Sequence, residues 1–344
     1  MEYKKIFIKQ AKPTSIGGQA VIEGVMMKGP ENIAIAVRKP DQQIIVKKEP
    51  LQGINKNNFN RIPILRGVFA LISSMVLGIK SLTYSAEFYD DGSEEEQKGK
   101  FELWIEKMFG EKADDLLIYL SVAIALLFGI GLFIILPTII ANFLKAGIKN
   151  SLLLNGIEGV IRILLFLGYV ILISQMKDIQ RVFQYHGAEH KTIHCFENGL
   201  PLTVENARNF TTLHPRCGTS FLFLVMVISI ILFSMVGWPN PWMRVVFRLI
   251  LMPVVAGVSY EVIRWSGRST SKFVYWISYP GLMLQKLTTR EPDDSQLEVA
   301  IAAMKGVLPS GENASGEAER QECGTEGSQA ADHITENDII LSDE

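Results

Sequence analysis

Cysteine is scarce in this sequence, and two other signals are missing. Its three cysteines, Cys195, Cys217 and Cys323, are too few and too scattered among 344 residues for a disulfide framework. The first thirteen residues carry four lysines but no apolar core of signal-peptide length, so we expect membrane insertion to use internal segments. No repeat of basic and aromatic residues indicates nucleic-acid binding. We therefore exclude a disulfide-rich secreted domain and expect no nucleic-acid partner.

Long apolar runs, in contrast, dominate the middle of the chain. They cover residues 116–143, 151–176, 220–236 and 245–265. Each approaches or exceeds the ~20 residues that a helix needs to cross the hydrocarbon core of a bilayer. The sequence therefore predicts a mainly α, polytopic membrane protein whose partner is the lipid bilayer. About four transmembrane helices are expected, in two hairpins, residues 116–176 and 219–265.

The distribution of charge predicts the orientation of these helices. Residues 306–344 hold ten carboxylates and one arginine, which leaves 33 basic and 26 acidic residues in the rest of the chain. Lysine and arginine gather near the N-terminus, in residues 177–218 and after residue 265, and such clusters favour the cytoplasmic side. Lys145 and Lys149 in the opposite loop reduce this bias. We expect a multi-pass protein of the cell membrane with both termini in the cytoplasm.

The segments before the first run predict a small sheet and one further helix. Residues 1–60 contain three short apolar strands, residues 20–22, 33–37 and 44–46, typical of a cytoplasmic β-meander. An isolated hairpin is only marginally stable, so this meander should rest on another part of the protein. Residues 61–115 predict an interfacial or re-entrant helix, because Arg66 and Lys80 interrupt its apolar stretch, followed by a charged linker. A fifth membrane crossing is the alternative for the apolar stretch, since both cations could extend toward the headgroups.

The segments after the last run predict a docked helix and a tail. Residues 266–305 form a cytoplasmic helical segment in which Leu297, Ile301 and Met304 recur at helical spacing. Residues 306–344 combine low hydrophobicity with strong negative charge, which predicts an acidic disordered tail.

Histidine is concentrated in one place, since four of the five histidines fall between His186 and His214. If the cytoplasmic loop of residues 177–218 is helical, His186, Glu189, His190 and His194 share one helix face. The spacing His-x-x-Glu-His is an inverted zinc-hydrolase motif: two imidazoles one turn apart can bind one metal ion, and the carboxylate can accept a proton. We predict His186 and His190 as metal ligands and Glu189 as the catalytic base.

A third ligand must come from elsewhere, because His194 lies one turn too far along the helix. His214 and Cys217 are the nearest candidates in sequence, and Glu197 and Glu205 are carboxylate alternatives. Zinc, or another divalent metal, suits a mixed imidazole and thiolate set. Haem is less suitable, because haem ligands normally face one another across helices inside the bilayer. Without a metal, these histidines would be polar residues of a cytoplasmic helix, bonded to carboxylates or lipid headgroups.

Glu23 is a further carboxylate that the fold could bring near the histidines. Gly24 follows it and Gly17-Gly18-Gln19 precedes it. Neither glycine segment has the strand-loop-helix spacing of a phosphate-binding loop, so we expect turns at both.

Ionisable residues within the apolar runs are a second group of interest, because a charge in hydrocarbon is costly. Glu158 and Arg162 lie one turn apart, and Arg248 and Glu261 lie near opposite ends of the last run. Ion pairing within or between helices is the simpler interpretation, and a polar pathway through the membrane is the alternative.

Several motifs in order resemble one family. They are GGQAVIEGVMM at residues 17–27, RIPILRG at 61–67, YHGAEHK at 185–191, LHPRCGTS at 213–220 and TTREPDD at 288–294. Together they resemble the YqhQ-like bacterial membrane proteins, over residues 15–308. The resemblance implies a membrane protein with a domain of unknown function, described as a metal-dependent enzyme.

The leading hypothesis is a membrane-embedded metal-dependent hydrolase whose site faces the cytoplasm. A peptide or a lipid-linked ester would reach such a site. The main alternative is a non-enzymatic assembly factor or scaffold, which binds a membrane protein partner or forms a homo-oligomer. A third hypothesis is a small transporter that uses Glu158, Arg162, Arg248 and Glu261.

Overall fold

The computed structural model describes residues 14–51, 62–89, 108, 113–148, 150–235, 240–266 and 272–308. The chain divides into two compact units. The first comprises Met1–Tyr89, Leu172–Leu224 and Gly257–Glu344, and the second comprises Asp90–Ile171 and Val225–Ala256. Most of the predicted charged linker and the predicted acidic tail, with Cys323, lie outside the described residues.

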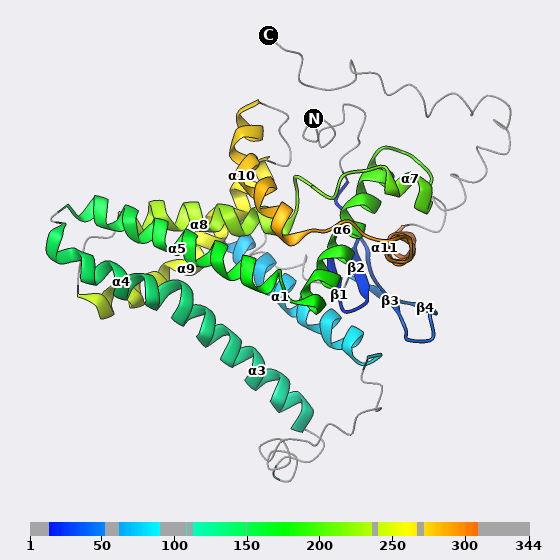
Figure 1. Cartoon of the computed structure of the whole chain (residues 1–344), viewed down its shortest axis with the longest axis horizontal. Coiled ribbons are helices and arrows are strands. Elements are labelled where there is room, and N and C mark those ends of the chain that lie inside the picture. The colour runs from blue at the N-terminus through cyan, green and yellow to red at the C-terminus, as the bar shows by residue number, and fades with distance from the viewer. Residues whose placement is uncertain are drawn as a thin grey trace. The chain divides into compact units, whose positions relative to one another are not determined.

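The first unit begins with a four-stranded antiparallel sheet (Figure 1). Its strands pair in sequence order: β1 Gly17–Val21, β2 Gly24–Lys28, β3 Asn32–Arg38 and β4 Ile44–Pro50. The predicted sheet is confirmed, with one strand more than the three expected. The additional strand arises because Ile22 and Glu23 form the turn of a hairpin, in which Glu23 adopts φ 48°. The expected turn is therefore present at Glu23, whereas Gly24 begins β2 and Gly17 and Gly18 belong to β1.

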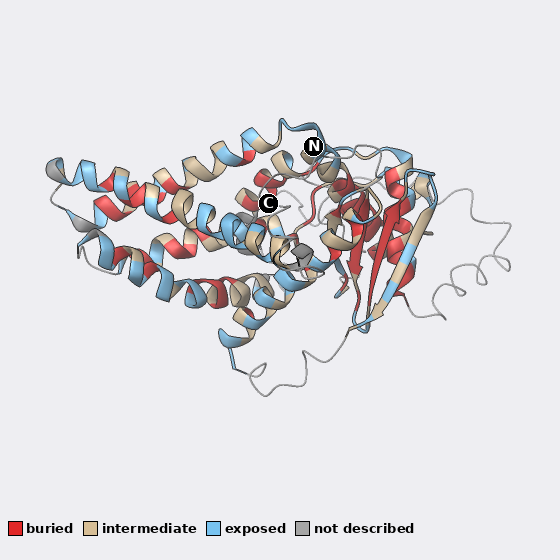
Figure 2. Cartoon of the chain, turned by 90° about the horizontal axis from the view of Figure 1, so that it is seen from below, coloured by how far each residue is buried: buried red, intermediate tan, exposed pale blue. Residues whose placement is uncertain are grey.

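The sheet is covered on both faces, and its central strands β2 and β3 are largely coloured as buried in Figure 2. Successive residues of a strand point to opposite faces. Val25 and Met27 pack in one core with helices α6 Lys177–Glu197 and α11 Asp294–Val307. On the other face, residues of β1, β2 and β3 pack against Leu77 and Tyr84 of α1, which spans Leu65–Ala86. The meander thus rests on other elements, as the sequence predicts.

Helix α11 confirms the predicted docked helix. Asp293 caps its N-terminus in a capping box with Gln296. Leu297, Ile301 and Met304 are buried on one face and join the core between the sheet and α6. The helical spacing read from the sequence therefore identifies the face that packs.

Four described helices are long and apolar enough to cross a membrane, as many as expected. They are Leu65–Ala86, Leu116–Leu144, Leu152–Ile173 and Trp242–Trp265. The set differs from the predicted one. It includes α1, because neither Arg66 nor Lys80 interrupts this helix. Arg66 pairs with Glu261, and Lys80 pairs with Glu49. The apolar helix α8, Gly218–Ser234, has 17 residues and falls in a shorter class, so a crossing there stays a prediction.

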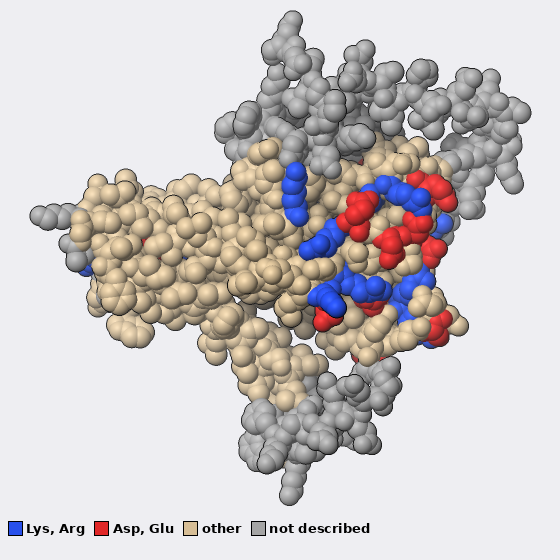
Figure 3. Space-filling view, in the orientation of Figure 1, with Lys and Arg blue, Asp and Glu red and all other residues tan. Residues whose placement is uncertain are grey.

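The second unit is built from apolar helices. Its elements are α3 Ala113–Ile130, the π-helical turn η5 Gly131–Ile135, α4 Leu136–Leu144, the short 3₁₀ helix η6 Lys145–Gly147, α5 Ser151–Ile173, and parts of α8 and of α9, Pro241–Ser266. Figure 3 shows almost no charge on the face of α5 and α8, whereas lysine, arginine and carboxylate side chains gather around α6, α11 and the sheet of the first unit. An uncharged helix surface suits contact with lipid.

Candidate functional site

Helix α6 carries four residues of interest, His186, Glu189, His190 and His194, and it is helical across all four. Glu189, His190 and His194 are buried, and His186 is partly buried. Gly187 allows the chain at Arg290 to cross the helix closely: a Cβ on Gly187 would lie 2.1 Å from the Arg290 carbonyl oxygen. There the Arg290 backbone N–H donates to the Phe183 carbonyl, at 2.9 Å. Glycine is therefore required at this crossing.

Two backbone carbonyls fix the imidazoles of His186 and His190. The Nδ1 of His186 lies 2.8 Å from the Thr288 carbonyl oxygen, and the Nδ1 of His190 lies 2.5 Å from that of Thr212. A carbonyl oxygen can only accept, so each Nδ1 carries the proton in the neutral ring. In that neutral form, each Nε2 has a free lone pair, the state in which imidazole binds a metal.

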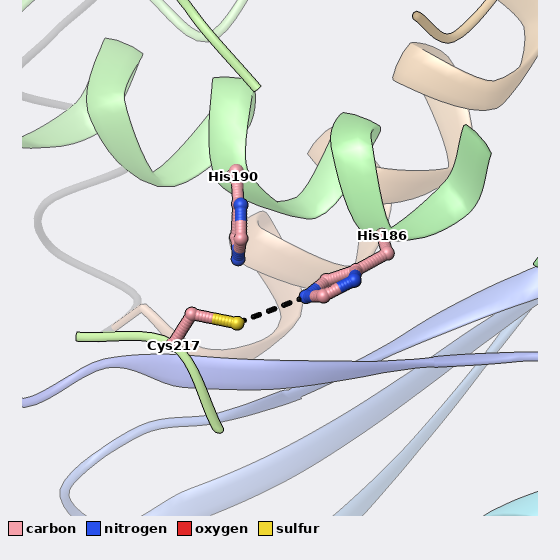
Figure 4. Close-up of side chains that lie close together, drawn as sticks. All are labelled: His186, His190 and Cys217. Atoms are coloured by element: carbon pink, nitrogen blue, oxygen red, sulfur yellow. Dashed lines mark hydrogen bonds between the residues drawn. The ribbon is translucent and has the colours of Figure 1, made fainter. Parts of the chain in front are cut away.

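Cys217 completes a compact group with these two rings (Figure 4). The Nε2 of His186 lies 3.2 Å from the Sγ of Cys217, and one ligand atom from each of the three residues lies within 4.8 Å of the others. Burial opposes charge on Cys217, but His186 and His190 bring its pKa well below the usual value. Burial likewise opposes charge on His186, yet Cys217 raises its pKa to about 9. The group therefore favours a thiolate, the form that binds metals.

Gln285 of helix α10, Lys272–Thr288, positions the loop that holds Cys217. Its Oε1 accepts from the His214 backbone N–H at 2.8 Å, and its Nε2 donates to the His214 carbonyl at 2.7 Å and to Ser220 Oγ at 2.9 Å. Gln285 is fully buried. Sequence reasoning missed this residue, although an amide inside the apolar stretch of residues 274–287 was a usable signal.

Glu189 is a buried carboxylate beside the two histidines. Its Oε2 has no hydrogen-bond partner among the described residues. Gly18 of β1 leaves the room for it, since a Cβ there would lie 2.9 Å from Glu189 Cδ. Burial raises the pKa of Glu189, while His190 and His186 partly oppose that shift. A buried carboxyl with a raised pKa can move a proton near neutral pH.

His194 and His214 form a neutral polar layer next to this group. The ring centroid of His214 lies 5.4 Å from that of His190 and 4.8 Å from that of His194. The Nε2 of His194 donates to the Leu213 carbonyl at 2.9 Å. Burial lowers the pKa of His194 to about 4 and that of His214 to about 3. His214 and Cys217 are the two candidates for the third ligand that lie nearest in sequence. The structure places Cys217 in the compact group and His214 beside it.

The carboxylate candidates lie in other surroundings. Glu197 accepts from the backbone N–H and the hydroxyl of Thr14, at 2.8 and 2.9 Å, and pairs with Arg216. Glu23 pairs with Arg181 and accepts from the hydroxyl of Tyr185 at 3.0 Å, so it contacts α6 at the residue directly before His186. Glu205 is exposed in α7, Val204–Arg208.

Comparison with known proteins identifies the family. Residues 62–310 match the model of a family described as protein of unknown function (DUF1385). The chain belongs to the DUF1385 family. The matched residues run from α1 to α11, so they include the compact group of His186, His190 and Cys217.

A curated relative of this DUF1385 chain supports the same assignment. The chain is 38% identical over 307 residues to the uncharacterized protein YqhQ of Bacillus subtilis (strain 168), covering 87% of this chain and 94% of that protein. The resemblance to YqhQ-like proteins is therefore confirmed. No solved structure matches the chain.

Proposed function

We propose that this protein is a metal-dependent hydrolase of the cell membrane, with its site on the cytoplasmic side. The observation that supports this most is the convergence of His186, His190 and Cys217 within 4.8 Å, with both Nδ1 atoms held by backbone carbonyls. Hydrogen bonds of this kind orient metal-binding imidazoles. Two imidazoles and one thiolate suit zinc, and three protein ligands leave a fourth position open for the reaction.

The chemistry would use the residues around that group. Zinc or another divalent cation there would act as a Lewis acid toward a carbonyl oxygen of the substrate. Glu189 would accept the proton of the attacking water and return it to the leaving group, a role that its raised pKa favours. Gly18 and the sheet behind it would hold this carboxylate away from bulk solvent. Since Cys217 directly precedes the apolar helix α8, a peptide bond or a lipid-linked ester near the membrane is the proposed substrate class.

Metal analysis of the purified full chain, never exposed to chelator, tests the proposal. We expect about one metal ion per chain, as in other three-ligand catalytic sites. The double variant His186→Ala/His190→Ala should lose it. His194→Ala is the matched control, because it removes an imidazole from the same helix whose Nε2 already bonds the Leu213 carbonyl. Absence of stoichiometric metal from the wild type would refute the proposal and favour the assembly-factor or scaffold alternative.

Glu189→Gln separates metal binding from chemistry. The amide keeps the shape of the carboxylate but cannot accept the proton, so we expect full metal content with loss of the cellular function. If the scaffold alternative holds, Glu189→Gln supports the cellular function as well as the wild type does in a complementation assay.

A second candidate function rests on the contact between His186 Nε2 and Cys217 Sγ, at 3.2 Å. A cysteine next to a histidine base can act as a nucleophile in acyl transfer without a metal. Under this alternative the thiol would react in the protein as purified, and a chelator would leave the activity unchanged.

A further inference from the structure

A buried cluster of charges lies in the second unit, apart from the histidine site. Glu158 of α5 is 1% exposed and binds two arginines of α9. The Nη2 of Arg248 donates to Glu158 Oε2 at 2.7 Å, and Arg244 Nη2 donates to the same oxygen. Thr138 of α4 donates to Glu158 Oε1 at 3.0 Å. The predicted ion pairing is thus confirmed, with the closest bonds running to α9.

Arg162 is the third cation of this cluster, and it lies farther from the Glu158 carboxylate than the other two. Its Nη2 lies 3.6 Å from Glu158 Oε1, beyond hydrogen-bonding distance, and has no hydrogen-bond partner among the described residues although it is buried. Its Nε donates to the Phe133 carbonyl in the π-helical turn η5, at 2.9 Å. A buried donor without an acceptor is rare in folded proteins, and a bound ion is one common explanation. Single π-turns in helices also occur frequently at functional sites.

The charges of the cluster do not balance. Glu158 is the only carboxylate in residues 116–171 and 225–256, whereas Arg162, Arg244 and Arg248 all surround it. Three guanidinium groups stay charged, since arginine does not lose its proton in proteins. Within the described part of these helices, three guanidinium groups therefore surround a single carboxylate, in an apolar setting where charge is costly. The transporter hypothesis also includes Glu261, but this carboxylate belongs to the first unit and pairs with Arg66 there.

The cluster lies close to one end of three candidate spans. Thr138 lies six residues before the end of Leu116–Leu144, and Glu158 six residues after the start of Leu152–Ile173. Arg248 lies six residues after the start of Trp242–Trp265. At a rise of 1.5 Å per residue, six residues correspond to roughly 9 Å. Trp242, which begins the third span, is 80% exposed, as is typical of a tryptophan at the membrane interface.

We propose that Arg162, Arg244 and Arg248 bind a phosphate group, supplied by an anionic lipid headgroup or by free phosphate. Guanidinium groups match phosphate oxygens in geometry, and the arrangement here offers a free Nη2 on Arg162. A phosphate dianion would neutralise the excess of two positive charges in the described cluster. A phosphodiester carries one negative charge and would neutralise half of that excess. The cluster lies roughly 9 Å along the helices from these span ends, so a phosphate group at that end of the spans would be close to it. The site is independent of the proposed metal centre, because it lies in the other unit.

Thermal unfolding of the detergent-purified full chain tests this site without any mutation. Phosphatidylglycerol, phosphatidylcholine and inorganic phosphate are added separately, against potassium chloride at equal ionic strength. We expect the melting temperature to rise with phosphatidylglycerol or phosphate and to change little with phosphatidylcholine, whose choline neutralises its phosphate. A response to phosphatidylglycerol alone identifies the lipid as the source, and competition by inorganic phosphate identifies the free anion. No rise with either probe overturns the proposal.

Arg162→Gln then assigns the binding to the cluster. This variant leaves the pairing of Glu158 with Arg244 and Arg248 in place, so the helices should stay together while affinity for the responding probe falls at least tenfold. Lys145→Gln is the matched control, because it removes one exposed cation near the same end of the spans and should retain affinity within twofold. If Arg162→Gln does not fold, Arg162→Lys keeps the charge without the planar fork and should still weaken binding. Equal affinity of the folded Arg162 variant and the wild type contradicts the assignment.

Discussion

His186 and Cys217 lie thirty-one residues apart in the chain, and their Nε2 and Sγ atoms lie 3.2 Å apart in the fold. The contact joins helix α6 to the first residue before the apolar helix α8. Any ligand held there would connect the histidine helix α6 directly to the apolar helix α8. The state of the Cys217 thiol therefore reports on what the site contains.

Alkylation of Cys217 should depend on metal. With zinc bound, the thiolate would be a ligand, so we expect iodoacetamide to modify Cys217 at least tenfold more slowly than in chelator-treated protein. Site-resolved mass spectrometry of a Cys323→Ser background measures the rates. Cys195 is an internal control, because burial raises its pKa to about 12 and should keep it unreactive in both states. Equal rates at Cys217 with and without zinc would contradict ligation and favour the nucleophile alternative.

Glu197 should contribute stability that acid removes. Burial opposes its ionisation, but His214, Thr14 and Arg216 lower its pKa to about 2. A lowered folded pKa stabilises the protein above the unfolded value of ~4.3, and this contribution is lost as the pH falls toward 2. We expect Glu197→Gln to lower the melting temperature at pH 7.5 by roughly 2–4 °C.

The pH dependence of that difference is the decisive measurement. The gap between wild type and Glu197→Gln should narrow as the pH falls from ~5 toward 3, because the wild-type carboxylate becomes protonated during unfolding. A gap that stays constant over this range would show that the ionised form of Glu197 is not what stabilises the fold.

Gly187→Ala should destabilise the packing of α6. The added Cβ would lie 2.1 Å from the Arg290 carbonyl oxygen, a backbone atom that cannot move without displacing the chain. We expect a loss of ~1–3 kcal/mol, typical of overpacking, measured as a lower melting temperature and as lower metal content. Gly168→Ala on α5 is the control, since open space surrounds that position and alanine favours a helix. An unchanged melting temperature in Gly187→Ala would contradict the close crossing.

Much of what depends on local sequence patterns was predicted correctly. Apolar runs identified three of the four candidate membrane helices, short apolar segments predicted the sheet, and spacings of three and four placed the histidines on one helix. The interruption of residues 62–83 by Arg66 was misleading about helix length, because its partner Glu261 lies 195 residues further along the chain. Two residues that form an ion pair but lie so far apart in the sequence produce no pattern in the local sequence.

Contacts between distant segments were settled only by the tertiary structure. It selected Cys217 over His214 as the third member of the compact group, and it supplied the carbonyls of Thr212 and Thr288, which have no side-chain signature. It also added Arg244 to the Glu158 cluster. Periodicity follows from the geometry of a single helix or strand, so one sequence reveals it. Which segments meet depends on the packing of the whole chain, and that is a property of the fold alone.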